Sequence, residues 1–105
     1  MKRSATTRSA SAVAAPLRQN ARGKLCTLRL SGCRHDPAYT VLAHLRRFGW
    51  AGMAQKPHDV LAVFACDACH AKQESRHPDC TDGDLLRALG ETLLIQLADG
   101  FIRVD

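Results

Sequence analysis

Three stretches of the chain carry the alternating or apolar patterns that β-strands produce. The first, KLCTLRLSGCR, alternates around Leu25, Thr27 and Arg29 and contains a Ser-Gly turn, which predicts a short hairpin with a cysteine near each end. The second, AYTVLAHLRR, is rich in β-forming residues and predicts a strand whose end carries His44. The third is the apolar run from Val60 to Phe64, which has strand length. Between the last two, FGWAGMAQKPHD holds two glycines and a proline and predicts a loop.

Two helices are predicted after the third strand. The segment DACHAKQESRH contains helix-forming residues and ends at Pro78, so its helix should begin near Asp67. In the second helix Thr81 is the expected N-cap, with Asp84 three residues later, and Gly100 is expected to end it. One face of this helix carries Leu85, Leu89, Leu93 and Gln96 or Leu97.

The predicted order is hairpin, strand, loop, strand, helix and helix, and FIRV near the C-terminus predicts a last short strand. The fold class is therefore α+β. A chain of 105 residues forms one domain with a modest core. Such a small domain, with only three Phe, one Trp and one Tyr, often needs a disulfide or a metal for stability. No apolar run is long enough to span a membrane.

The positive charge is concentrated at the front of the chain. Residues 1–35 hold eight of the 15 Lys and Arg residues and none of the ten acidic ones. Such an acid-free basic segment favours a polyanionic partner, most often nucleic acid. Residues 1–20 are rich in Ser, Ala, Thr and Arg and predict a flexible basic tail. A tail that serves only solubility and a mitochondrial transit peptide are alternatives, whereas AVAAPL is too short for a secretory signal.

Four of the five cysteines form two closely spaced pairs. Cys26 and Cys33 have six residues between them in C-x6-C, and Cys66 and Cys69 form C-x2-C at a predicted strand-to-helix turn. Paired short spacings let each turn deliver two ligands to a tetrahedral Zn²⁺, so structural zinc is predicted. Disulfides, a thioredoxin-like redox pair and simple buried cysteines are the alternatives. Cys80 is expected to be a free thiol.

Two histidines stand at positions that suggest a second site. His44 ends the first strand of the central unit, and His70 follows Cys69 directly on the first turn of the predicted helix. Glu74 lies four residues after His70, on the same helix face. His70 and Glu74 could thus hold a divalent ion beside the zinc, with His44 facing it across the sheet.

The sequence resembles a known family over roughly residues 21–105. VLAHLRRFGWAGMAQKPHD followed by VFACDACHAKQE is similar to the YbcO-like nucleases of phages and prophages, most specifically in AHLR, KPHD and CDACH. These proteins are placed in the His-Asn-His (HNH) endonuclease superfamily. The resemblance implies a small zinc-stapled treble-clef or ββα-metal domain at residues 21–105, with an added C-terminal helix, after a tail at residues 1–20.

The resemblance also implies roles for individual residues. His44 matches the general base that takes a proton from the attacking water. His70 and Glu74 match ligands of the catalytic cation, which stabilises the pentacoordinate phosphate. The resemblance further matches the structural zinc ligands to Cys26, Cys33, Cys66 and Cys69, and phosphate contacts are expected from Arg46, Arg47 and Lys56.

Two positions depart from the superfamily pattern. Many members have His or Asp just before the base, where this chain has Ala43. The Asn that orients the base has no obvious match, and Asp59 is the nearest candidate.

The expected function is that of a cytoplasmic, phage- or prophage-encoded HNH endonuclease that hydrolyses DNA. It would use a structural Zn²⁺ and a second divalent cation such as Mg²⁺ or Mn²⁺. A non-catalytic, zinc-stabilised nucleic-acid-binding module is the alternative, and a protein-protein adaptor in a phage replication complex is a third.

Overall fold

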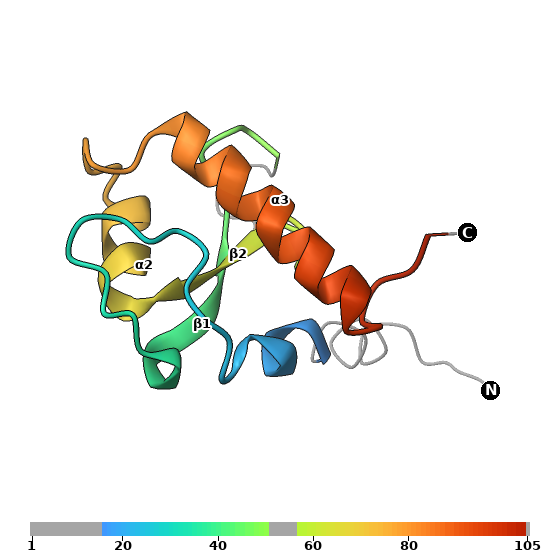
Figure 1. Cartoon of the computed structure of the whole chain (residues 1–105). Coiled ribbons are helices and arrows are strands. Elements are labelled where there is room, and N and C mark those ends of the chain that lie inside the picture. The colour runs from blue at the N-terminus through green and yellow to red at the C-terminus, as the bar shows by residue number, and fades with distance from the viewer. Residues whose placement is uncertain (1–15, 51–56, 105) are drawn as a thin grey trace, which may run out of the picture.

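The chain folds into a two-stranded sheet with helices packed against it, which confirms the α+β class (Figure 1). The computed structural model describes residues 16–50 and 57–104. Its elements are a helical segment at residues 16–21, the 3-10 helix η1 (Pro37–Tyr39), strands β1 (Thr40–His44) and β2 (Ala62–Cys66), and helices α2 (Asp67–Glu74) and α3 (Asp82–Ala98).

The two strands pair in antiparallel register. Thr40 lies opposite Cys66 at one end of the sheet, and His44 lies at the other end. The two predicted strands of the central unit, the one that ends at His44 and the one at Val60 to Phe64, are confirmed. The second of them, β2, begins two residues later than expected. The residues before it form a turn, in which the N–H of Leu61 donates to the carbonyl of His58 at 2.8 Å. Strand β2 ends at Cys66, and α2 begins at the next residue.

Local sequence signals predicted the starts of both α2 and α3 correctly. Helix α2 begins at Asp67 as expected, and Cys66 is its N-cap. At the start of α3, Thr81 and Asp84 form both hydrogen bonds of a capping box. Just beyond the end of α3, Gly100 adopts the left-handed conformation with φ of +81°, which only glycine accepts without strain.

The buried face of α3 includes Leu85 and Gln96 of the predicted face but is otherwise different. Leu93 is only half-buried and Leu97 is exposed. The reason is that Thr92 packs against the edge of the sheet. Its hydroxyl oxygen accepts the N–H of Phe64 at 3.2 Å and lies 3.0 Å from the hydroxyl of Thr27. The buried residues of α3 are Leu85, Ala88, Thr92 and Gln96.

The predicted hairpin at residues 24–34 is wrong, because this segment is an irregular loop. Several of its backbone groups bond to other elements, and no strand ladder forms within it. The N–H of Thr27 donates to the carbonyl of Phe64 at 2.7 Å. The guanidinium of Arg87 donates to the carbonyls of Thr27 and Leu28, both at 2.8 Å. The loop is thus held between β2 and α3.

The last short strand expected at FIRV is also wrong, because residues 101–104 contain no strand. The N–H of Phe101 donates instead to the carbonyl of Gln96 at 2.9 Å, so the chain leaves α3 by folding back on the last turn of the helix.

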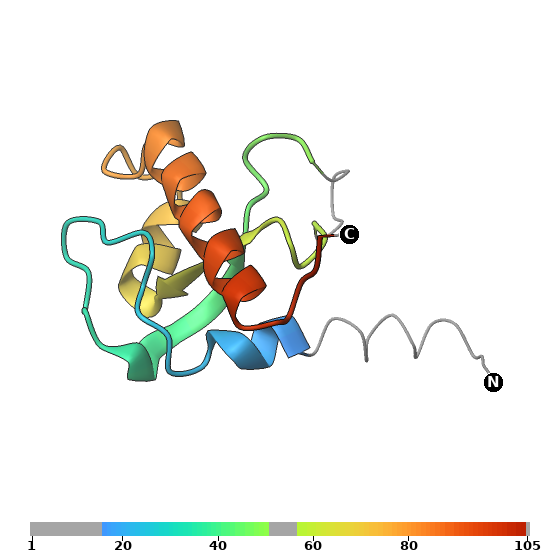
Figure 2. The same cartoon turned by 45° about the vertical axis from the view of Figure 1, so that its right-hand side comes forward.

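The N-terminal boundary lies earlier than the predicted end of the flexible tail at residue 20. Residues 16–21 are helical, and Leu17 and Ala21 are buried. The amide of Asn20 donates to Gln96 at 2.7 Å and to Asp99 at 3.1 Å. Figures 1 and 2 both show this segment beside the C-terminal end of α3. Residues 16–20 therefore belong to the folded domain, whereas residues 1–15 lie outside the described residues.

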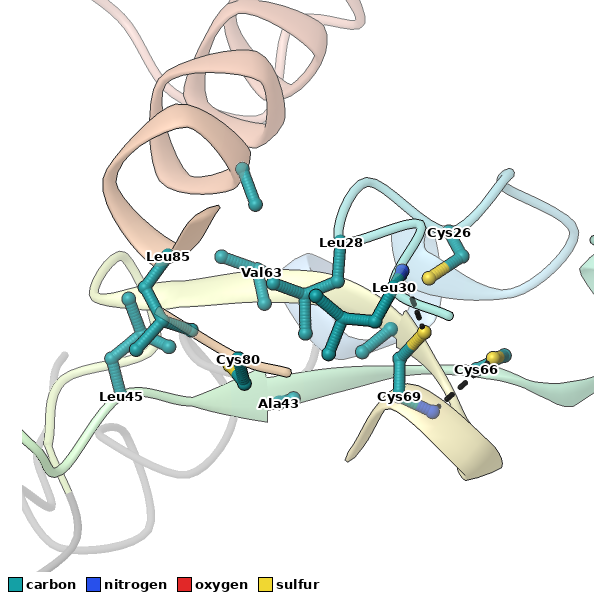
Figure 3. Packing of buried hydrophobic residues seen from close by; sticks show 12 residues of the cluster. Cys26, Leu28, Leu30, Ala43, Leu45, Val63, Cys66, Cys69, Cys80 and Leu85 are labelled. Atoms are coloured by element: carbon teal, nitrogen blue, oxygen red, sulfur yellow. Dashed lines mark hydrogen bonds between the residues drawn. The ribbon is translucent and has the colours of Figure 1, made fainter. Parts of the chain in front are cut away.

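The core consists of two clusters that share the sheet. The alternation of β1 sends Leu42 into the cluster with Phe64 and the helical segment, and sends Ala43 into the cluster with Val63 and Leu85. Figure 3 shows the cluster that contains Ala43, Val63 and Leu85, where leucines of the irregular loop pack with α3 and the cysteines. In residues 16–50 and 57–104, no helix combines the length and the apolar character that a membrane crossing needs.

Candidate functional site

The four cysteines of the two predicted pairs converge on one point. Cys26 and Cys33 come from the irregular loop, while Cys66 and Cys69 come from the junction of β2 and α2. Their sulfur atoms all lie within 4.8 Å of one another, and none forms a disulfide. Cys80 is buried in the same core cluster but is not part of this group (Figure 3). The group could hold a metal ion.

Backbone N–H groups surround these sulfur atoms. The N–H of Leu30 donates to Cys69 at 3.4 Å, and the N–H of Arg34 donates to Cys66 at 3.5 Å. Burial raises the pKa of the Cys66 thiol, but the N–H groups of Arg34 and Cys69 outweigh it and bring the pKa to about 7. Burial raises the pKa of the Cys69 and Cys33 thiols. Four thiols with N–H donors aimed at their sulfurs fit a tetrahedral zinc thiolate site.

His44 is held in place from two sides. Its Nε2 lies 2.6 Å from Oδ1 of Asp59, and its backbone carbonyl accepts a hydrogen bond from Gln73 at 3.3 Å. The side chains of His44 and Asp59 are only 11% and 5% exposed. The second carboxylate oxygen of Asp59 lies 3.4 Å from the guanidinium of Arg18. The ring of His44 therefore has a fixed orientation.

Two members of this network were not predicted from the sequence. Gln73 is buried on the face of α2 that points toward the sheet, four residues after Cys69. Residues four apart lie on the same face of a helix, so the spacing from the predicted zinc ligand Cys69 was a usable signal that Gln73 also faces inward. Arg18 belongs to the segment that the composition assigned to the flexible tail, and no local pattern distinguishes it. Gln73 fixes the distance between α2 and the end of β1.

A cavity of about 170 Å³ brings together the side chains that the sequence marked as a second site. None of the four cysteines lines it. Its walls are formed by Leu42, His44, Arg46, His70 and Glu74. The cavity thus joins the end of β1 to the exposed face of α2.

His70 and Glu74 supply two candidate ligands for a cation in this cavity. In the part of the chain that the structure describes, the four cysteines are the only group of three or more His, Cys, Asp or Glu side chains close enough to hold a metal. A cation in the cavity would therefore take its remaining ligands from water and substrate, which is the usual mode for Mg²⁺.

The three predicted phosphate-binding residues have different surroundings. Arg46 lines the cavity. Arg47 is largely buried, with a side chain 14% exposed, and its guanidinium donates to the carbonyl of Cys80 at 2.8 Å and to Asp82 at 3.1 Å. Arg47 therefore anchors the start of α3 and does not line the cavity. Lys56 lies outside the described residues.

Ala43 does not face the cavity. It is completely buried, in the core cluster on the face of the sheet opposite Leu42. A metal ligand at this position would point into the core in this chain. The absence of His or Asp before His44 therefore leaves the lining of the cavity unchanged.

Comparison with known proteins assigns the family. The family described as "Putative nuclease YbcO" matches residues 15–94. The "Putative nuclease YbcO" of Escherichia coli K12 and the "Putative nuclease ybcO" of Enterobacteria phage 82 are each 37% identical to this chain over 94 residues, which cover 85% of this chain and 98% of the relative. A solved structure described as "Structure of a putative bacteriophage protein from Escherichia coli str. K-12 substr. MG1655" is 33% identical, with a TM-score of 0.62 over 81% of this chain and 100% of the other. This chain therefore belongs to the YbcO family of putative nucleases.

Proposed function

We propose that this chain is a metal-dependent endonuclease of the HNH type that hydrolyses phosphodiester bonds in DNA. The observation that carries the proposal is the cavity that brings His44, His70 and Glu74 together, away from the cysteines. In this assignment β1, β2 and α2 form the ββα-metal unit, and the loop at residues 24–34 completes a treble clef around the zinc. The same three side chains would have no reason to converge in a module that only binds.

His44 is the general base in this mechanism. An ionised carboxylate only accepts hydrogen bonds, so the ring nitrogen that faces Asp59 carries the proton in the neutral imidazole. The other ring nitrogen, Nδ1, is then unprotonated and can accept a proton from the attacking water. Asp59 thus orients the base, in the way that a third group orients the base of a nucleophile-base pair.

His70 and Glu74 hold the catalytic cation in this proposal. One imidazole and one carboxylate suit Mn²⁺, Ni²⁺ or Mg²⁺ better than they suit a closed zinc site. The cation, when bound, stabilises the charge that develops on the phosphate and on the leaving oxygen. Arg46 lies in the same cavity, where its charge favours the binding of a phosphate.

The four-cysteine group holds a structural Zn²⁺. A tetrahedral ion held by these four cysteines would take all its ligands from protein sulfur and would have no open position for a substrate. The zinc therefore fixes the loop and the start of α2, and thereby the position of His70 one residue after Cys69.

DNA is the proposed substrate, and the cell that carries the phage or prophage is the proposed location, in its cytoplasm. The relatives are each named as a putative nuclease, and one of them comes from a phage. The basic residues of the front segment, eight Lys and Arg before residue 36, supply charge that attracts a phosphate backbone.

The proposal is tested by cleavage of a supercoiled plasmid with Mg²⁺, Mn²⁺ or Ni²⁺ added in turn. The wild-type chain should nick or linearise the plasmid only when a divalent ion is present. His70→Ala should need a higher concentration of Mn²⁺ for the same rate, because one ligand is lost. If no ion supports cleavage while the protein still binds DNA, the alternative of a zinc-stabilised binding module is the better account.

A further inference from the structure

A larger hollow of about 570 Å³ lies beside the proposed catalytic cavity. Leu42 lines both, so the two hollows adjoin along β1. One wall comes from η1 and β1, and the other comes from the helical segment and the turn after it. The size falls in the range of pockets that hold small organic ligands, roughly 300–1,000 Å³.

The two walls of this hollow differ in chemistry. The wall of η1 and β1 is apolar, with Pro37, Ala38 and Leu42 among its residues. The opposite wall carries two guanidinium groups, of Arg18 and Arg22. Within the described part of the chain Arg22 has no carboxylate partner, and Arg18 is 3.4 Å from Asp59 with a side chain 41% exposed. An apolar face opposite positive charge fits a flat, uncharged ring that carries an anionic group.

A buried hydroxyl of this hollow lacks a partner. Thr40 lines the hollow and is only 5% exposed, and its Oγ1 has no hydrogen-bond partner within the described residues. Burial of a hydroxyl without a hydrogen bond is costly, so such groups are rare in folded proteins. The hydroxyl is closed off from the hollow, so the surface that a ligand would meet there is formed by the neighbouring apolar side chains.

We propose that this hollow binds one nucleotide of the cleaved strand, next to the scissile phosphate and unstacked from its neighbours. The base lies against Pro37, Ala38 and Leu42, and its phosphate meets Arg22. This inference rests on the proposed function, because the neighbouring cavity must hold the phosphodiester. A base can enter such a pocket only when it is unpaired or flipped out of a duplex. The preferred substrates are therefore single strands, flaps and other DNA with unpaired nucleotides.

Binding of DNA to the full-length protein without added divalent ion tests the inference independently of cleavage. The probes are a fluorescently labelled thymidine dodecamer and the same oligonucleotide paired with its complement, measured by fluorescence anisotropy at one fixed salt concentration. Ala38→Phe fills the hollow with a larger side chain, and Thr40→Val removes only the hydroxyl. The matched control for the first is Ala98→Phe, at an exposed position of α3 that lines neither hollow.

Ala38→Phe should weaken binding of the single strand about tenfold or more, the loss expected when one base contact is removed. Thr40→Val changes a hydroxyl that is closed off from the hollow and should change this binding little, and both variants should leave binding of the duplex nearly unchanged. Ala98→Phe should change neither. Equal effects of Ala38→Phe on both probes, or no effect on either, would overturn the subsite. A chain that cuts DNA without showing these effects refutes the subsite alone, whereas one that shows them but cuts nothing refutes the nuclease alone.

Discussion

At the scale of single residues, the site depends on how the ring of His44 is held. Asp59 sits in the turn before β2 and is 15 residues from His44 in sequence, yet its carboxylate lies 2.6 Å from the ring. Gln73 holds the backbone of the same residue from α2. The spacing of the cysteines and the position of His70 after Cys69 were readable from the sequence. Of the two partners that were missed, Gln73 had only its spacing from Cys69 as a signal and Arg18 had none, because each acts through a contact between segments far apart in the chain.

Replacement of Asp59 tests the orienting role. Asp59→Ala removes the hydrogen-bond partner of the ring, so the cleavage rate should fall by more than about tenfold. The fall should not exceed the roughly 10²–10⁴ that a general base contributes. Asp59→Asn keeps an oxygen that can accept the ring N–H and should retain more activity than the alanine variant. The rates are measured under single-turnover conditions. Asp79→Ala, at an exposed carboxylate paired with Lys72, is the control and should cut at the wild-type rate. Equal rates for Asp59→Ala and wild type would refute the orienting role.

At the scale of elements, local signals determined what the sequence could predict. The capping box of α3, the start of α2 and the position of β1 follow from neighbouring residues, and all three are found. The hairpin at residues 24–34 failed because its backbone bonds to β2, to Arg87 and to the sulfur atoms. The buried face of α3 is rotated because Thr92 covers the edge of β2. These outcomes depend on tertiary contacts, which alternation and helical period do not encode.

The attachment of the irregular loop at residues 24–34 to α3 should depend on pH. Arg29 and Arg87 bond the carboxylate of Glu91, and the hydrogen bond from Arg29 opposes the effect of burial and lowers the pKa of Glu91 to about 2. A carboxyl group whose pKa is lowered by folding contributes stability that is complete above its unfolded pKa of 4.5 and is lost as pH falls toward the folded value.

Glu91→Gln should therefore lower the melting temperature at about pH 6 by a few degrees, as expected for a half-exposed ion pair. The difference in melting temperature between the variant and the wild type should shrink at about pH 4, because the wild-type carboxyl begins to protonate in the unfolded chain. Thermal unfolding followed by circular dichroism measures both values. A difference that stays constant over this range would mean that the charge of Glu91 does not stabilise the loop.

At the scale of the whole molecule, the fold is a small sheet with two modest core clusters, one of which includes side chains from a loop that has no regular structure. The four cysteines connect that loop to the junction of β2 and α2. Without a metal, four thiols would be left close together in the interior, and the loop would be held against α2 mainly by surface contacts, such as the hydrogen bond from Lys72 to the carbonyl of Ser31 at 2.6 Å. The metal site is thus expected to stabilise the domain as a whole.

Removal of zinc tests this expectation. A strong chelator should cause loss of the far-ultraviolet circular dichroism signal of the helices, because binding of a structural zinc is coupled to folding in small domains. Excess Zn²⁺ should restore the signal. Elemental analysis should find one zinc per chain in the untreated protein, and Cys66→Ser should lower that content. A metal-free chain that keeps its signal and its melting temperature would contradict a structural role for zinc.

The central claim is that His44 acts as the general base of a nuclease, and single-turnover cleavage of DNA by matched histidine variants tests it most directly. His44→Ala should cut about 10²–10⁴ times more slowly than the wild type, with unchanged zinc content and nearly unchanged DNA binding. His77→Ala is the control, because the side chain of His77 is 44% exposed and lines neither hollow, and it should cut at the wild-type rate. Cleavage by His44→Ala at the wild-type rate would contradict the account.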